Sequence, residues 1–136
     1  MADRAGHARA FYKRTAGAEI NVAIGLARLE LKVDWASRLG TASIGRYLLA
    51  AMARERVDCS RVVCDTSQKP GFQFKGRVTG GSDPAVESHR QGSAASHMRD
   101  TDIDGNWLLS ARHLHATGVF AAISATTFPA SRKPWT

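Results

Sequence analysis

The sequence predicts an α/β fold, and three features carry that prediction. Apolar residues recur at intervals of three and four in two segments, as they do on the buried face of a helix. A short run typical of a strand follows each of these segments, so helices and strands alternate along the chain. With 136 residues, of which 43% are hydrophobic and 23% are charged, the chain is long enough to bury a core.

The first helix is expected over about residues 19–30, followed by a strand over residues 32–37. Ser43 is placed to cap a second helix, and residues 62–64, Val-Val-Cys, form the next expected strand. The apolar residues of the first helix are Ile20, Ala23, Ile24, Ala27 and Leu31, and those of the second are Ile44, Tyr47, Leu48, Ala51 and Met52.

The middle of the chain predicts a β-hairpin. Phe72, Phe74 and Val78 alternate with polar residues, a period of two that is typical of a strand with one solvent-facing side. Residues 79–84, Thr-Gly-Gly-Ser-Asp-Pro, are rich in turn formers, and residues 85–90 can return as the partner strand.

The remaining elements are expected near the C-terminus. Asp102 is placed to cap a helix that carries Ile103, Trp107, Leu108 and Ala111. Residues 113–118 are expected to form a strand ending in glycine, and Ser124 to start a last helix.

Composition and charge argue against several classes of protein. The net charge is +7, but the arginines are scattered and no nucleic-acid-binding motif is present, so we expect no dedicated nucleic-acid binding. The longest apolar run, residues 47–53, is far shorter than the ~20 residues that span a bilayer. Two cysteines and the lack of an apolar leader fit a cytoplasmic protein. The two Cys and the His pair 113/115 lack metal-ligand spacing, so no metal site is expected.

One segment, residues 15–23, is a candidate for ligand binding. Gly17 lets a ligand approach the backbone closely, and the amide of Asn21 can donate and accept hydrogen bonds. Free backbone N–H groups at a helix start favour an oxygen-rich ligand. On spacing alone, a loop-to-helix junction capped by glycine is the favoured interpretation of the segment.

Three segments, residues 16–23, 35–40 and 45–48, resemble the N-terminal signature of the ribokinase-like carbohydrate kinases of the phosphofructokinase-B (PfkB) type. Within that family, residues 16–23, 71–75 and 89–96 are similar to the 2-keto-3-deoxygluconate kinases. The resemblance implies that residues 1–136 are the N-terminal part of a three-layer α/β kinase domain, with an inserted hairpin lid at about residues 71–92.

The resemblance also implies an activity, the ATP-dependent phosphorylation of the sugar acid 2-keto-3-deoxygluconate, with ATP and Mg²⁺ as cofactors of the full-length family. The residues implied at the sugar site are Gly17, Ala18, Glu19, Ile20, Asn21, Gln73, Ser88, His89 and Arg90. A guanidinium can bind a carboxylate bidentately, so Arg90 would favour a sugar acid over a neutral sugar. Without the resemblance, an exposed strand arginine explains Arg90 as well.

Several positions depart from the family pattern. Gln73 and Ser88 stand where similar kinases usually have an aromatic residue. Glu30 and Arg56 stand where the family has a glycine that closes a helix. A non-glycine residue in that left-handed conformation costs on the order of 1 kcal/mol.

The family's catalytic Gly-Ala-Gly-Asp motif does not occur in the 136 residues. Residues 71–78 have the glycine spacing of a phosphate-binding loop but end in Arg-Val instead of Lys-Ser/Thr, and they alternate as a strand. We therefore expect no catalytic base and no strong ATP binding, so that the chain alone is inactive. The alternative hypothesis is a non-catalytic protein, either a truncated remnant or a module that forms homo-oligomers through the lid.

Overall fold

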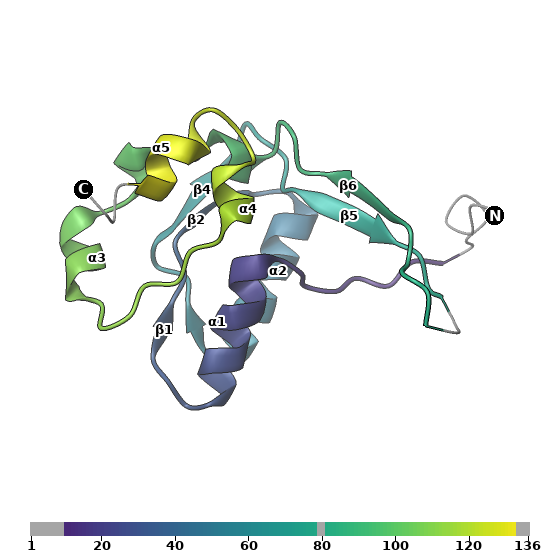
Figure 1. Ribbon diagram of the computed structural model, residues 1–136, viewed down its shortest axis with the longest axis horizontal. Coiled ribbons are helices and arrows are strands. Elements are labelled where there is room, and N and C mark those ends of the chain that lie inside the picture. The colour runs from purple at the N-terminus through teal and green to yellow at the C-terminus, as the bar shows by residue number, and fades with distance from the viewer. Residues whose placement is uncertain (1–9, 79–80, 133–136) are drawn as a thin grey trace.

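The computed structural model describes residues 10–78 and 81–132, and it has an α/β body from which a hairpin projects (Figure 1). The body contains α1 (Ala18–Arg28), β1 (Val33–Asp34), β2 (Ser37–Gly40), α2 (Ser43–Arg54), β3 (Val57–Asp58) and β4 (Val62–Asp65). The hairpin consists of β5 (Phe72–Lys75) and β6 (Val86–His89). Two 3₁₀ helices, η1 (Ala94–His97) and η2 (Asp100–Asp102), precede α3 (Gly105–Ser110), α4 (Gly118–Ala121) and α5 (Thr127–Arg132).

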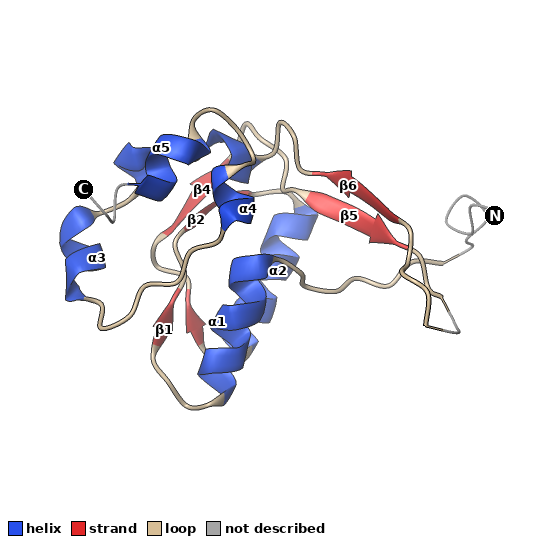
Figure 2. Cartoon of the chain, in the orientation of Figure 1, coloured by secondary structure: helices blue, strands red, loops and turns tan. Residues whose placement is uncertain are grey.

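The strands of the body form two short parallel pairs, which together are called the ladder below. β1 pairs with β3, and β2 pairs with β4 so that Ser37 lies opposite Val62 and Gly40 lies opposite Asp65. Parallel neighbours need a crossover, and α2 supplies it. The helices pack against this ladder (Figure 2) around a core formed by Ile20, Ala23, Ala27, Met52 and Val57.

Both predicted helices of the body are confirmed, and each is followed by a residue in the left-handed conformation. α1 stops at Arg28, and Glu30 follows in the left-handed conformation with a φ of 64°. α2 stops at Arg54, and Arg56 follows with a φ of 61°. The expected left-handed positions are therefore present, and each is filled by a residue with a Cβ atom.

Two glycines of the body permit a close backbone approach. A Cβ atom on Gly45, in the first turn of α2, would lie 1.7 Å from the carbonyl oxygen of Gly40. A Cβ atom on Gly40 would lie 2.3 Å from the carbonyl oxygen of Gln68. The start of α2 is thus seated directly on the end of β2.

A buried carboxylate ties the loop after β4 to its neighbours. Asp65 Oδ1 accepts hydrogen bonds from the backbone N–H groups of Ser67 and Gln68, at 2.8 and 3.1 Å, and from the Ser67 hydroxyl. Asp65 Oδ2 accepts one from Arg38 Nε at 2.9 Å, and Arg38 also pairs with Asp102. The hydrogen bond from the Ser67 hydroxyl has the largest effect, and together with the other hydrogen bonds it holds the pKa of Asp65 well below its usual range.

Three helix starts differ from the expectations. Ser43 is the first residue of α2, and its N-cap is Ala42, which makes no side-chain hydrogen bond. Asp102 ends η2 instead of capping α3; the cap is Asp104, whose Oδ1 accepts from the N–H groups of the next turn. The last helix exists but begins at Thr127, three residues after Ser124.

Two strand predictions also need correction. The strand expected over residues 32–37 is interrupted: β1 ends at Asp34 and β2 begins at Ser37, although Trp35 N still donates to Asp58 O of β3 at 2.8 Å. Residues 113–118 form no strand. They run as a loop up to Thr117, whose Oγ1 accepts a hydrogen bond from Val119 N at 3.2 Å and so caps α4. The alternation of residues 113–117 is that of a strand, but no neighbouring strand pairs with them within the described residues.

The predicted hairpin is confirmed. β5 and β6 are antiparallel, with Phe72 opposite His89 and Gln73 opposite Ser88. Of the expected turn, residues 79–80 lie outside the described residues. The alternation along the ladder gives the hairpin one face with Phe72, Phe74 and His89 and another with Gln73 and Ser88.

Candidate functional site

The N-terminal end of α1 has backbone donors that no side chain caps. Gly17 is its N-cap and makes no side-chain hydrogen bond. The Asn21 side chain is exposed and makes no hydrogen bond with the described residues, so it is available to a ligand. Ala18 is half-buried, and Ile20 is buried in the core. Ile20 can therefore offer a ligand only its backbone.

The carboxylate of Glu19 has a protein partner. Thr117, which precedes α4, donates its hydroxyl hydrogen to Glu19 Oε1. The contact joins residues 98 positions apart in the sequence. It places α4 against the first turn of α1.

The polar face of the hairpin carries the candidate cation. Arg90 follows β6, and its Nε donates a hydrogen bond of 2.9 Å to the Ser88 hydroxyl. Gln73 lies opposite Ser88 in the ladder. Among the described residues, Arg90 has no carboxylate within ion-pair distance, which leaves the outer edge of its guanidinium free.

His89 points away from this group. Its ring stacks on that of Phe72 with centroids 4.8 Å apart, and its Nε2 lies 2.7 Å from Glu87 Oε1. Both partners belong to the aromatic face of the hairpin. The structure thus brings together Gln73, Ser88 and Arg90 and separates His89 from them.

An open hollow of about 550 Å³ lies between the hairpin and α4. One wall has Ser88, Arg90 and Gln91, and the other has Gly118, Val119, Ala122 and Ile123. α4 lies next to the upper end of α1, where that helix begins (Figure 1), and the Glu19–Thr117 contact links the hollow to the Gly17 turn. The candidate site consists of this hollow and that turn.

The residues on the α4 wall were not expected from the sequence. The alternation of residues 113–117 suggested a strand, so the helix that carries Val119 and Ile123 was missed. The signal that could have revealed it is Thr117 directly before a short run of small and apolar residues, since threonine is a common N-cap.

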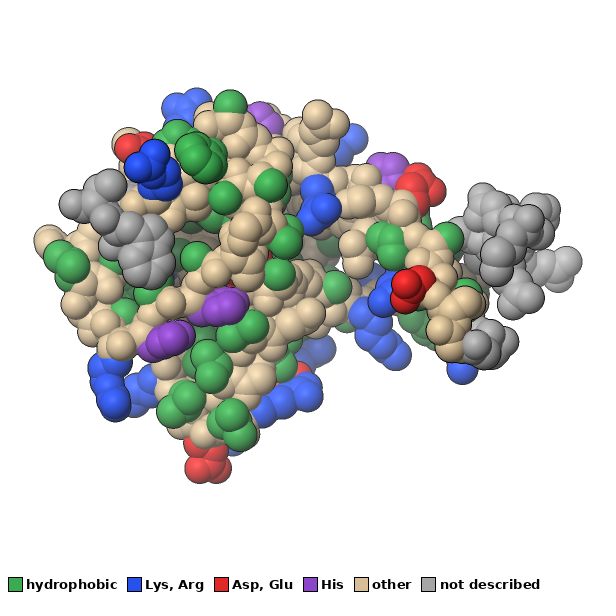
Figure 3. All heavy atoms as spheres, viewed as in Figure 1, with side chains coloured by type: hydrophobic (Ala, Val, Ile, Leu, Met, Phe, Trp, Pro, Cys, Tyr) green, Lys and Arg blue, Asp and Glu red, His purple; other side chains and the backbone are tan. Residues whose placement is uncertain are grey.

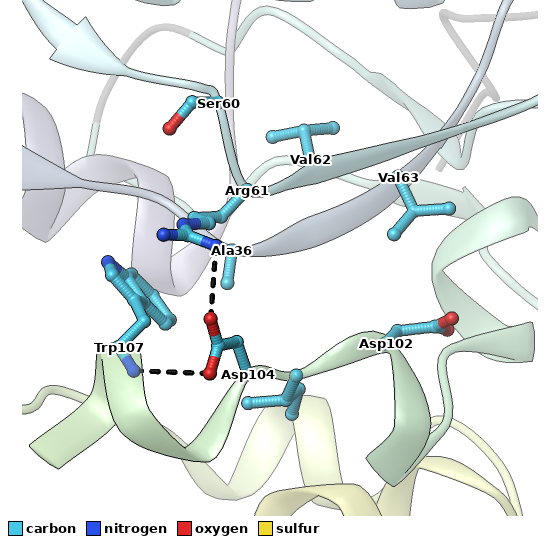
Figure 4. Close-up of a pocket in the computed structure, with 9 residues that line it drawn as sticks. Ala36, Ser60, Arg61, Val62, Val63, Asp102, Asp104 and Trp107 are labelled. Carbon is cyan, nitrogen blue, oxygen red and sulfur yellow. Dashed lines mark hydrogen bonds and ion pairs between the residues drawn. The ribbon is translucent and has the colours of Figure 1, made fainter.

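A second hollow, of about 200 Å³, lies between β4 and α3 and contains two carboxylates (Figure 4). Asp104 lies between Arg61, at 3.2 Å from its Nη1, and the N–H of Trp107. Asp102 pairs with Arg38. Because its charged groups already have partners, this hollow is the weaker candidate.

The described residues give no support for other kinds of site. No three His, Cys, Asp or Glu side chains gather there as metal ligands. Residues 72–75 belong to the hairpin ladder, so the glycine-containing segment 71–78 does not form a phosphate-binding loop. Lys and Arg are dispersed over the face seen in Figure 3. None of the described helices is both long and apolar enough to cross a bilayer.

Comparison with known proteins identifies relatives that match most of the chain. The model of the "pfkB family carbohydrate kinase" matches residues 2–129. The 2-dehydro-3-deoxygluconokinase of Bacillus subtilis is 40% identical over 116 residues, which cover 85% of this chain and 36% of that protein. The enzyme of the same name from Thermoproteus tenax is 31% identical over 117 residues, which cover 84% of this chain and 35% of that protein. The chain thus spans about a third of the length of these curated relatives.

Solved structures of sugar kinases also resemble this chain. A PfkB protein from Polaromonas sp. JS666 is 76% identical and superposes with a TM-score of 0.91, over 95% of this chain and 43% of that one. A sugar kinase from Pyrococcus horikoshii, solved in complex with ATP, is 28% identical with a TM-score of 0.82, over 92% of this chain and 40% of that one. Both have the α/β arrangement described above.

Proposed function

Since the chain belongs to the pfkB family of carbohydrate kinases, with a ribokinase-like α/β fold, we propose that it carries the sugar-acid-binding portion of an ATP-dependent kinase. The proposed substrate is 2-keto-3-deoxygluconate, the compound also called 2-dehydro-3-deoxygluconate. The names of two relatives, at 40% and 31% identity, support this choice.

The observation that carries the proposal is the position of Arg90. Arg90 lines the hollow, its Nε donates to the Ser88 hydroxyl, and its guanidinium has no acidic partner among the described residues. A carboxylate bound by the free N–H groups would form charge-assisted hydrogen bonds. A sugar acid therefore fits this cation better than a neutral sugar does.

The other proposed contacts follow from the positions of the side chains. The backbone of Gly17 to Ile20 and the amide of Asn21 would bind sugar hydroxyls at the start of α1. Gln73 and Ser88 would approach from the hairpin, which would act as a lid over the sugar. His89, on the opposite face, is not part of this proposal.

The chemical step lies outside the proposed role of this chain. The Gly-Ala-Gly-Asp motif that supplies the base in similar kinases does not occur in the 136 residues, and segment 71–78, with its two glycines, contains a hairpin strand and not a phosphate-binding loop. We therefore propose that the 136-residue chain binds the sugar acid without phosphorylating it. A coupled assay with ATP, Mg²⁺ and 2-keto-3-deoxygluconate should remain at background; turnover above it would contradict this.

Calorimetric titration with 2-keto-3-deoxygluconate tests the binding site. Arg90→Ala should weaken binding by roughly 10- to 100-fold, the effect of losing hydrogen bonds to a charged group. Arg77→Ala is the matched control, since it removes an exposed hairpin arginine that does not line the hollow. Equal affinities of the Arg90→Ala variant and the unaltered chain would reject the proposal.

A second candidate function, self-association through the hairpin, is favoured by its aromatic face. Phe11 packs on Phe74 with ring centroids 5.1 Å apart, yet Phe11 is 62% exposed and Phe72 is 37% exposed. Exposed apolar surface of this kind is typical of interaction sites. Sedimentation over a range of concentrations should show a dimer that Phe72→Ser weakens, whereas a monomer at all concentrations would exclude this function.

A further inference from the structure

The hydrogen bond between Glu19 and Thr117 connects helices α1 and α4. The Thr117 hydroxyl donates its single hydrogen to Glu19 Oε1. Thr117 Oγ1 also accepts a hydrogen bond from Val119 N at 3.2 Å. One hydroxyl therefore both joins α4 to α1 and caps the first turn of α4.

α4 depends on such external contacts. It has only four residues, Gly118–Ala121, too few for a helix that is stable on its own. It nevertheless forms the wall of the hollow that faces Ser88 and Arg90. Phe120 packs α4 against the cluster of Met98, Ile103 and Ala130, and the Thr117 contact ties the start of α4, which contributes Gly118 and Val119 to the wall, to α1.

The carboxylate of Glu19 has two possible roles. As a direct ligand it would accept hydrogen bonds from sugar hydroxyls. In the structure it accepts one from Thr117, and it is held in the first turn of a helix whose Ile20 is anchored in the core. The geometry points to the second role: we infer that Glu19 is a positioning residue, which holds α4 through Thr117 and so shapes the sugar-acid site without touching the sugar.

This inference rests on the proposed function, and four single variants test it by titration with 2-keto-3-deoxygluconate. Glu19→Ala and Thr117→Val each remove the contact and should weaken binding about tenfold, the effect of one hydrogen bond to a charged group. The double variant should bind no more weakly than either single one, since both remove the same interaction.

The conservative variants separate the two roles. Glu19→Gln keeps an oxygen that can accept from Thr117, and Thr117→Ser keeps the hydroxyl, so both should bind within about threefold of the unaltered chain. A Glu19→Gln variant as weak as Glu19→Ala, together with normal binding by Thr117→Val, would make Glu19 a direct ligand and overturn the inference.

Amide hydrogen exchange supplies a readout that needs no ligand. Glu19→Ala and Thr117→Val should speed exchange at Val119 N and at Ala122 N, which donates to Gly118 O in α4. Exchange at Asn21 N, which donates to Gly17 O in α1, should not change and is the internal control.

The titration and the hydrogen exchange test the proposed function and the inference independently. If no form of the chain binds the sugar acid, the proposed function fails, while exchange in α4 still decides whether Glu19 positions that helix. Unchanged exchange at Val119 overturns the inference. Faster exchange with unchanged affinity overturns it as well, because α4 would then not shape the site.

Discussion

The α/β body and the hairpin contribute to the same candidate site but are held in different ways. In the body, Met52 is fully buried, and the turn that begins at Gly17 is anchored through Ile20. In the hairpin, all four residues of β6, Val86–His89, are exposed, and the cross-strand ladder positions them. The comparison suggests a division of roles: substitutions in the body should change stability, and those on the polar face of the hairpin should change binding.

The largest effect on stability is expected at Met52. Met52→Ala leaves a cavity between α1, α2 and β3 and should lower the free energy of unfolding by about 2–5 kcal/mol. Denaturant unfolding measures this, with Met52→Leu as the volume-conserving control at less than about 1.5 kcal/mol. A loss below that of the control would show that the helices are not packed around this side chain.

The second effect is a pH dependence that originates in the body. The pKa of Asp65 is held below its usual value, so its stabilisation is complete above the unfolded-state pKa of about 3.9 and is lost as the pH falls from there toward the lower folded-state pKa. The chain should therefore lose stability below about pH 4. In Asp65→Asn that acid-side slope should become shallower.

The slope should not vanish in that variant, because the pKa values of Glu55 and Asp58 are also lowered, by hydrogen bonds from Arg28 and Ser60 respectively. Thermal melting of both proteins across the acidic range checks this prediction. An identical slope with and without the Asp65 carboxylate would contradict it.

A smaller effect, of opposite sign, is expected where the helices of the body end. Glu30→Gly and Arg56→Gly relieve left-handed residues and should each raise the free energy of unfolding by about 0.5–1 kcal/mol. Ala53→Gly, an exposed site inside α2, is the control and should cost about 1 kcal/mol. Destabilisation by both glycines at the two left-handed positions would refute the cost assigned to them.

The smallest effect on stability is expected on the hairpin. Gln73→Ala removes an exposed side chain that lies outside the core and should change the free energy of unfolding by less than about 0.5 kcal/mol. It should still weaken sugar-acid binding by a few fold, since it removes one neutral hydrogen bond. A loss of stability larger than the loss of binding would break the division between the two regions.

Local patterns predicted much of this fold. The periodicity of residues 20–31 and 44–52 gave both helices, and the alternation at Phe72 and Phe74 gave the hairpin. The left-handed positions of Glu30 and Arg56 were expected from the place of glycine in similar sequences. The helices and the hairpin strand were predictable because their patterns lie within about a dozen consecutive residues.

The missed elements depend on distant partners. Residues 113–117 alternate like a strand, but a strand also needs a neighbour to pair with, and local alternation does not supply one. Asp102 and Asp104 look alike as caps, and burial of Ile103 between them places the helix start after the second. The contact of Glu19 with Thr117 joins residues 98 positions apart and has no local signature, so the position of α4 against α1 could not be predicted from the sequence.

The selectivity of the chain for an acid over a neutral sugar tests the central claim most directly. Titrations with 2-keto-3-deoxygluconate and with fructose give an affinity ratio for the unaltered chain and for Arg90→Gln. We predict a ratio of at least about tenfold that falls close to one in the variant, with an unchanged unfolding midpoint. A ratio that is the same in both proteins would contradict the assignment of Arg90 to the substrate carboxylate.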